Sequence, residues 1–207
     1  QGALTHASIS ASDLAAGRFD GARVEFGVVD WETFDHAVLY RGEIGAISQE
    51  AGRFAAELRS AKTLLEQDGV PRTSPTCRAQ SCGPGCGPSP ARFTHECAVR
   101  DVDLSANRVA FAGAPGDARM AGGHLRWLDG PQAGLRMEVV RADGDGLVVD
   151  RPLDAATAAG IRAELREGCD HTFHTCSTRF ANAVNFRGEP FLPGNDFVAR
   201  YPAGGGA

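Results

Sequence analysis

The stretch GHLRWLDGPQAGLRMEVVRADGDGLVVD, residues 123–150, decides the fold class of this 207-residue chain. It contains three short segments rich in apolar residues, at 123–128, 135–140 and 146–150. The turn-forming runs Asp129-Gly130-Pro131 and Asp143-Gly144-Asp145 separate them. Short segments divided by Gly and Asp turns are typical of antiparallel strands. The stretch therefore predicts part of a small antiparallel barrel or sandwich.

Further strands are expected on both sides of this stretch. Residues 97–104 and 108–113 flank the turn Ser105-Ala106-Asn107, and residues 161–166 form a last strand. We expect residues 97–166 to be a small inserted β domain.

The first part of the chain also has the composition of strands. Segments rich in Val, Phe and Tyr or set at hairpin spacing occur at 23–30, 36–41, 43–48 and 53–58. Ser60 is a suitable N-cap for a short helix over 60–67. The chain begins at Gln1 without an initiator Met, so we expect it to be the middle of a longer polypeptide. We expect residues 1–70 to be a β domain that continues from an upstream part.

Composition excludes several classes of function. Hydrophobic residues make up 43% of the chain, enough for a buried core. The formal net charge of -5 gives no basic surface for nucleic acid and no polybasic stretch for anionic lipid. No apolar run approaches the length of a membrane-spanning segment. We therefore expect no nucleic-acid contact and no transmembrane segment.

The six cysteines are unevenly distributed. Four lie between Cys77 and Cys97, with Cys82 and Cys86 between them, and none precedes Cys77. The last two form a C-x6-C pair, Cys169 and Cys176. Such clustering indicates one local chemical site.

Residues 70–90 combine three of these cysteines with many prolines and glycines. A flexible linker needs no cysteines, whereas a loop that surrounds a metal needs tight turns to direct several sulfurs to one point. Thiolates suit zinc, Cu(I) and iron–sulfur clusters. Zinc sites favour C-x2–4-C turns, so the C-x8-C interval from Cys77 to Cys86 mildly favours an iron–sulfur cluster and leaves zinc open.

Two other interpretations of the cysteines are open. Six cysteines allow fifteen disulfide pairings. A catalytic cysteine is also possible, because His171 and His174 lie near Cys176 in sequence and His95 lies near Cys97. However, no nucleophile signature surrounds any of the cysteines, which favours polar or supporting roles for the histidines.

Several motifs together resemble one family. They are Phe19-Asp20-Gly21-Ala22-Arg23-Val24-Glu25, Gly52-x-Phe54-x-x-Glu57-Leu58-Arg59, Cys77-Arg78-Ala79, Cys86-Gly87, Gly130-x-x-Ala133-Gly134, Gly168-Cys169-Asp170, Phe173-x-Thr175-Cys176, Arg179-Phe180-x-Asn182-x-x-Asn185-Phe186-Arg187-Gly188 and Pro193-Gly194-Asn195-Asp196. This set resembles the tail-tip hub proteins of siphophage-like prophages and gene transfer agents of alphaproteobacteria, which are similar to the minor tail protein at the tail tip of lambda-like phages. The resemblance runs over nearly the whole chain and is most specific from residue 168 to residue 196.

The resemblance implies a set of ligands and partners. Hubs of this family are trimeric, join the distal tail ring to a host-contacting fibre protein, and hold a [4Fe-4S] cluster by four cysteines. Cys77, Cys86, Cys169 and Cys176 match the family's two intervals, which makes the cluster the expected cofactor and zinc the second choice. Cys82 and Cys97 are extra, and Cys82 is a possible substitute for Cys86.

These observations give one expected architecture. We expect a mainly β fold with small antiparallel barrel or sandwich regions, and an irregular Cys/Gly/Pro-rich iron–sulfur cluster region with short helices. The cluster-binding region is expected to comprise residues 71–96 and 167–207.

The expected function is structural. The chain is interpreted as a non-enzymatic, homotrimeric hub in the tail of a phage-like particle, assembled in the bacterial cytoplasm and released from the cell. The alternatives are a tail-associated cysteine peptidase or cell-envelope hydrolase, and a zinc or iron–sulfur redox or regulatory protein.

Overall fold

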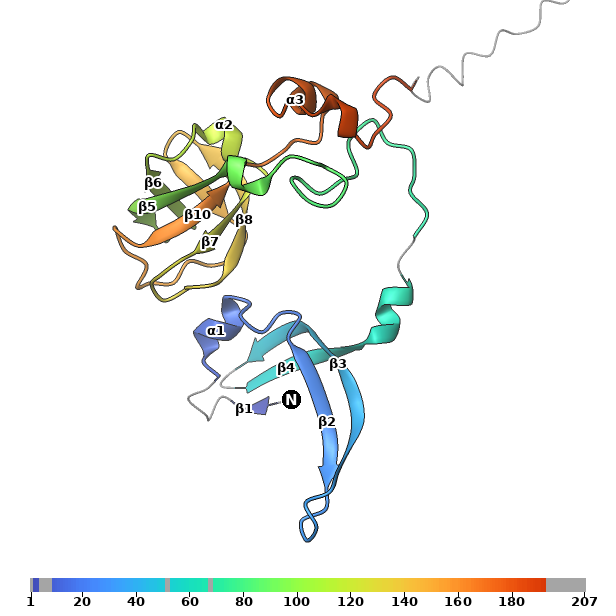
Figure 1. Cartoon of the computed structure of the whole chain (residues 1–207). Coiled ribbons are helices and arrows are strands. Elements are labelled where there is room, and N and C mark those ends of the chain that lie inside the picture. Colours follow the sequence, from blue (N-terminus) through green and yellow to red (C-terminus); the bar gives the residue numbers. More distant parts are fainter. Residues whose placement is uncertain (1, 4–8, 51–52, 67–68, 193–207) are drawn as a thin grey trace, which may run out of the picture.

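Two antiparallel sheets dominate the chain in a computed structural model that describes residues 2–3, 9–50, 53–66 and 69–192 (Figure 1). The first sheet has the strand order β1-β4-β3-β2. Its strands are β1 (Gly2–Ala3), β2 (Arg23–Val29), β3 (His36–Glu50) and β4 (Arg53–Ser60).

The second sheet is a closed barrel with the strand order β10-β5-β6-β9-β8-β7. Every neighbouring pair in it is antiparallel. Its strands are β5 (Thr94–Asp103), β6 (Arg108–Ala112), β7 (His124–Trp127), β8 (Arg136–Asp143), β9 (Gly146–Val149) and β10 (Arg162–Arg166). The expectation of a mainly β fold with a small antiparallel barrel is confirmed.

The helices of the described residues are short. The α-helices are α1 (Ala11–Ala15), α2 (Asp117–Met120) and α3 (Phe173–Thr178), and the 3-10 helices are η1 (Ala61–Glu66), η2 (Pro90–Phe93) and η3 (Ala183–Asn185). No helix in this part of the chain is long and apolar enough to cross a membrane.

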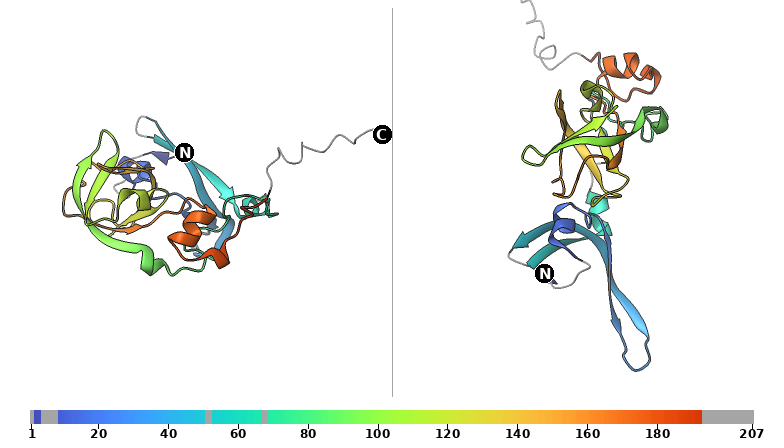
Figure 2. Two further views of the ribbon diagram at one scale, coloured as in Figure 1. Left: turned by 90° about the horizontal axis from the view of Figure 1, so that it is seen from above. Right: turned by 90° about the vertical axis from the view of Figure 1, so that its left-hand side faces the viewer.

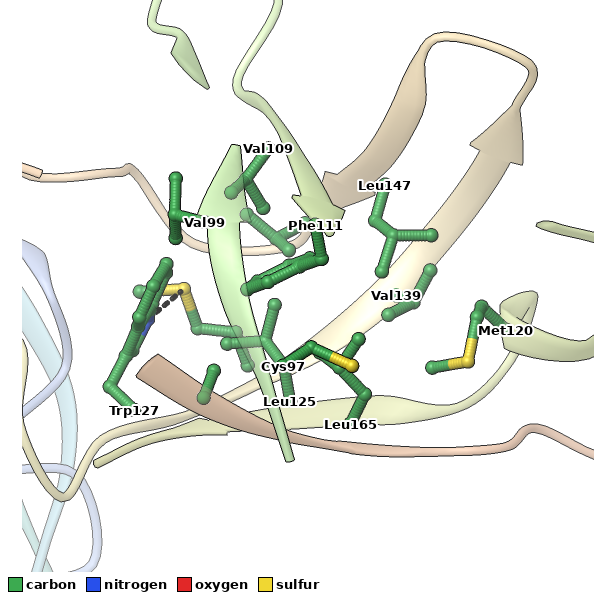
Figure 3. Packing of buried hydrophobic residues seen from close by; sticks show 13 residues of the cluster. Cys97, Val99, Val109, Phe111, Met120, Leu125, Trp127, Val139, Leu147 and Leu165 are labelled. Atoms are coloured by element: carbon green, nitrogen blue, oxygen red, sulfur yellow. Dashed lines mark hydrogen bonds between the residues drawn. The ribbon is translucent and has the colours of Figure 1, made fainter. Parts of the chain in front are cut away.

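The barrel encloses the core because its strands alternate between inward and outward side chains. On β8, Met137 and Val139 are buried while Arg136 and Glu138 face out, as the two-residue period of a strand requires. Other strands contribute further buried side chains, among them Val99, Val109, Phe111, Leu125, Trp127, Leu147, Ala163 and Leu165 (Figure 3). The indole Nε1 of Trp127 donates to Met137 Sδ at 3.5 Å, so its polar atom has a partner inside the core.

The barrel lies between the first sheet and the α3 segment (Figure 2). Arg151 joins the barrel to the N-terminal part: its guanidinium pairs with Asp20 at 3.1 Å and donates to the carbonyl oxygen of Ala16 at 3.1 Å. Arg18 donates to the carbonyl oxygen of Pro131 at 3.3 Å. These contacts fix one end of the barrel, while the other end carries the cysteine-containing segments.

Three local expectations differ from the structure. Residues 36–41 and 43–48 were expected as two strands but form the single strand β3, because Gly42 between them is paired with Val24 on one side and with Ser60 on the other. The helix expected over 60–67 is the 3-10 helix η1, and residue 67 lies outside the described residues. The strand expected to start at Cys97 begins at Thr94. Of the expected cluster-binding region, 193–207 also lie outside the described residues.

Candidate metal centre

Cys77, Cys82 and Cys86 lie in a segment, residues 69–89, that has neither helix nor strand. Tight turns replace regular structure there: Gly83 N donates to Gln80 O at 2.9 Å, and Cys86 N donates to Gly83 O at 3.0 Å. Cys82 has a φ of 54°, an unusual left-handed conformation for a residue with a side chain. The turns bring the backbone back on itself over a few residues, as the Gly/Pro content predicts.

Cys169 and Cys176 lie on the segment that follows β10. Thr172 caps α3 by accepting from Thr175 N at 3.2 Å, and Cys176 is buried within that helix. The carboxylate of Asp170 accepts from Thr172 N at 2.9 Å and from Thr175 Oγ1 at 2.8 Å. Local capping therefore fixes the turn between the two cysteines.

The two segments dock against each other through paired hydrogen bonds. Cys77 N donates to His171 O at 2.8 Å, and the ring Nδ1 of His171 lies 2.9 Å from Cys77 O. Arg78 N donates to Arg187 O at 3.0 Å. The side chain of Asn182 donates to Cys86 O. Cysteines about 90 positions apart in sequence are thus held at one seam, which is the contact between residues 69–89 and the segment that follows β10.

An ion pair closes the same seam at its outer end. Both Nη atoms of Arg78 donate to the carboxylate of Glu189, at 2.7 and 2.9 Å. Together with the donated N–H of Ser74, Arg78 lowers the pKa of Glu189 to about 2. The close approach also depends on Gly188, because a Cβ there would lie 2.5 Å from Thr76 O.

Three of the four sulfurs expected as ligands accept hydrogen bonds from N–H groups. His171 N donates to Cys169 Sγ at 3.4 Å, and Arg187 N donates to Cys77 Sγ at 3.3 Å. Asn182 Nδ2 lies 3.8 Å from Cys86 Sγ. The fourth, Cys176 Sγ, donates to Asn182 O at 3.4 Å.

The four thiols also interact electrostatically. Burial raises the pKa of Cys176, and the charges of Cys169, Cys77 and Cys86 raise it further. Burial likewise raises the pKa of Cys169, while the N–H of His171 and the charge of Arg179 act in the opposite direction. Gathering like charges in this way is unfavourable unless a cation compensates them.

Arg179 is the cation placed at this group of thiols. Its guanidinium lies 4.4 Å from the ring centroid of Phe180, and its Nη2 donates to the carbonyl oxygen of Gly168. Its Nε is buried without a hydrogen-bond partner, which is costly for an N–H of a charged group. A buried, unpaired donor beside Cys169 fits a site built to receive an anionic group.

The two remaining cysteines lie apart from this seam. Cys97 is on β5, where its side chain is buried in the barrel core. Cys82 lines a cavity between the loop and the barrel, together with Gly123, His124 and Arg166. Burial raises the pKa of Cys82, and the charge of Cys86 also raises it.

Among the residues that the structure describes, no group of three or more His, Cys, Asp or Glu side chains is arranged to hold a metal ion. All six cysteines are free, and no histidine ring in the described ranges is hydrogen-bonded to a cysteine sulfur. His95 instead pairs with Glu167 at 3.0 Å.

Sequence reasoning missed the residues that surround the thiols. Arg179 and Asn182 lie in the motif that carried the family resemblance, but the pattern alone assigned them no role. No sequence pattern indicated a role for Glu189, because its partner Arg78 is 111 positions away.

Two family models match separate stretches of the chain. Residues 1–89 match the family described as "Baseplate hub protein, N-terminal attachment domain", and residues 118–196 match the family "Phage conserved hypothetical protein BR0599". No curated protein matches the chain. A chain of the solved structure "Virion of native gene transfer agent (GTA) particle" is 34% identical with a TM-score of 0.77, and the match covers 96% of this chain and 73% of that one.

The chain belongs to the baseplate hub family of phages and gene transfer agents. The resemblance seen in the sequence motifs is therefore confirmed. As a member of the hub family, the chain is a tail-tip protein of a phage-like particle, and it partners with other tail proteins there.

Proposed function

We propose that this hub-family chain is the non-enzymatic structural centre of a tail tip, where a homotrimer joins the distal tail ring to the host-contacting fibre protein. The similarity to a chain of a gene transfer agent virion over 96% of the sequence supports a structural role. The match of residues 1–89 to an attachment domain supports a role in joining other tail components. On this proposal the particle is assembled in the bacterial cytoplasm and released from the cell.

We further propose that Cys77, Cys86, Cys169 and Cys176 hold a [4Fe-4S] cluster. The observation that carries this proposal is the set of N–H groups at three of the four sulfurs, each donated across or within the seam. Such hydrogen bonds stabilise thiolate ligands and tune iron–sulfur clusters. The buried, unpartnered Nε of Arg179 supplies a further donor and a positive charge.

The chemistry that the cluster supplies when bound is four iron–thiolate bonds, which join residues 71–96 to residues 167–207. The protein's own part is to align the two segments, through the Cys77–His171 hydrogen bonds and the Arg78–Glu189 ion pair. By analogy with a disulfide, a crosslink that closes a loop of about 90 residues stabilises the fold by roughly 4–5 kcal/mol. Residues 1–70 and 97–166 then act as the two β domains that this crosslinked region connects.

Anaerobic purification tests the cofactor. We expect brown protein with about four iron and four sulfide per chain, whereas colourless protein with one zinc would refute the cluster. Cys86→Ser should lose the iron, and Cys82→Ser is the matched control that should retain it. The reverse result would make Cys82 the ligand.

Electron microscopy of particles tests the structural role separately. An epitope-labelled chain should appear at the tail tip, in three copies per particle. Complete, functional tails that lack the chain would refute the hub assignment whatever metal the protein binds.

A further inference from the structure

Strands β2 and β3 continue beyond the first sheet as a two-stranded arm, residues 24–41. The last pair between β3 and β4 is Gly42 with Ser60, so the arm has no third strand beside it. It projects away from the barrel (Figures 1 and 2). A two-stranded ribbon alone is marginally stable in water, so an arm of this length needs packing against something else.

The arm exposes an unusual concentration of large apolar side chains. They are Phe26, Val28, Val29, Trp31, Phe34, Val38 and Leu39. Trp31 is 79% exposed and Phe34 is 78% exposed, both at the tip. Several large apolar side chains exposed on one short segment indicate an interaction site, whereas single exposed apolar residues do not.

Both faces of the ribbon carry these side chains. Because side chains alternate along a strand, Val28 and Val29 of β2 point to opposite faces. A flat partner surface would cover only one face. The distribution therefore fits insertion into a groove.

The tip is a hydrogen-bonded turn whose aromatic rings are exposed. Asp30 N donates to Asp35 O at 2.8 Å, and Phe34 N donates to Asp30 O at 2.8 Å. The carboxylate of Asp30 accepts from Glu32 N at 2.8 Å. Phe34 has a φ of 61°, a strained conformation for a bulky residue, which the hydrogen bonds maintain. Such a tip presents Trp31 and Phe34 with little ordering left to occur on binding.

The tip is also acidic. Asp30, Glu32 and Asp35 lie within six residues that contain no Lys or Arg, and backbone N–H groups lower the pKa of Asp30. Arg41 pairs with Glu25 at 2.8 Å, at the base of the arm. A complementary partner thus presents Lys or Arg around an apolar groove.

We propose that the arm inserts its tip into an apolar groove rimmed by Lys or Arg on a different protein of the tail. This inference rests on the proposed function, and the match of residues 1–89 to an attachment domain supports it. A second copy of this chain is a poorer partner, because the chain carries a net charge of -5. The cavity beside α1 offers no net positive charge, because Asp20 and Glu43 offset Arg59 and Arg151 in its lining.

Incorporation of the full-length chain into particles tests the proposal. The double variant Trp31→Ser/Phe34→Ser should lower incorporation at least about tenfold, since buried aromatic anchors dominate binding energy. The matched control Leu104→Ser/Val140→Ser changes exposed apolar residues of the barrel part and should leave incorporation unchanged. Glu32→Lys should lower incorporation severalfold by placing a cation against the basic rim.

The results of these experiments distinguish a failure of the arm proposal from a failure of the hub assignment. Circular dichroism and thermal unfolding verify that each variant folds. A folded Trp31→Ser/Phe34→Ser protein that enters particles like the wild type overturns the arm proposal alone. Absence of the wild type from tails overturns the hub assignment. A photo-crosslinking residue at position 31 should capture another tail protein, and a crosslink to a second copy overturns the proposed occupant.

Discussion

Cys77 and His171 face each other across the seam and bond twice, with Cys77 N 2.8 Å from His171 O and His171 Nδ1 2.9 Å from Cys77 O. Because a carbonyl oxygen only accepts, Nδ1 of His171 carries the proton. The backbone of His171 has a φ of 60°, which the pairing helps to hold. One residue pair thus aligns both cysteine-bearing segments.

Replacement of His171 should weaken that alignment. His171→Ala removes the ring hydrogen bond, so we expect a loss of about 1 kcal/mol in the free energy of unfolding. His171→Asn should lose less than the alanine variant, because Asn tolerates a positive φ. Urea denaturation measures both, and equal stability of the wild type and the alanine variant would contradict the role of the pair.

The sequence predicted the barrel better than it predicted this seam. Strand segments such as those around Met137 and Leu147 are short-range patterns, and Gly/Asp turns mark their ends. The partner of Cys77 is 94 positions away, and that of Arg78 is 111 positions away. Spacing could group the cysteines, but it could not identify these partners, because they depend on how the chain folds back after the barrel.

Some local structure also escaped the sequence reasoning for physical reasons. Helices α1 and α2 span only five and four residues, too short for a helical period to appear. The sequence predicts strands in the arm but not their exposure, because Val and Phe have the same β propensity whether a third strand covers them or not.

The ion pair between Arg78 and Glu189 should make stability depend on acid pH. The pKa of Glu189 falls from 4.5 to about 2 on folding, so its contribution is complete above about pH 4.5 and is lost as the pH falls toward 2. Glu189→Gln should therefore be less stable than the wild type at pH 7, and the difference should shrink at pH 3. Glu57→Gln, at an exposed glutamate paired with Arg59, is the control. A constant difference at both pH values would argue against the ion pair.

His124 should remain neutral well below the usual pH of histidine titration. Burial, together with the charges of Arg136 and Arg166, lowers its pKa to about 4, and Glu164 opposes this only in part. Since the folded state then binds fewer protons, stability is complete above about pH 6.5 and declines as the pH falls toward 4. NMR titration of the ring protons measures the pKa directly. A midpoint near 6.5 would show that burial and the charges of Arg136 and Arg166 do not lower the pKa of His124 as the structure indicates.

Leu165 should be among the most costly residues to truncate in the barrel. Its side chain is fully buried on β10, against the core formed by strands such as β7 and β5. Leu165→Ala should lower the free energy of unfolding by about 2–5 kcal/mol. Val140→Ala, at a position 66% exposed on β8, should change it by less than about 0.5 kcal/mol. Chemical denaturation of both variants gives the comparison.

Arg179 should determine how firmly the proposed cluster is retained. Its unpaired Nε and its charge lie beside Cys169, whose thiolate it stabilises. Arg179→Met removes both charge and donor while keeping an apolar stem over Phe180. We expect severalfold faster loss of visible absorbance in the presence of an iron chelator, with near-wild-type barrel stability. Arg179→Lys separates the two contributions: retention like the wild type would assign the effect to charge, and retention like Arg179→Met would assign it to the Nε donor. If both variants retain iron like the wild type, the guanidinium serves only to link Gly168 to Phe180, and the positive charge needed beside the thiolates must come from the metal itself.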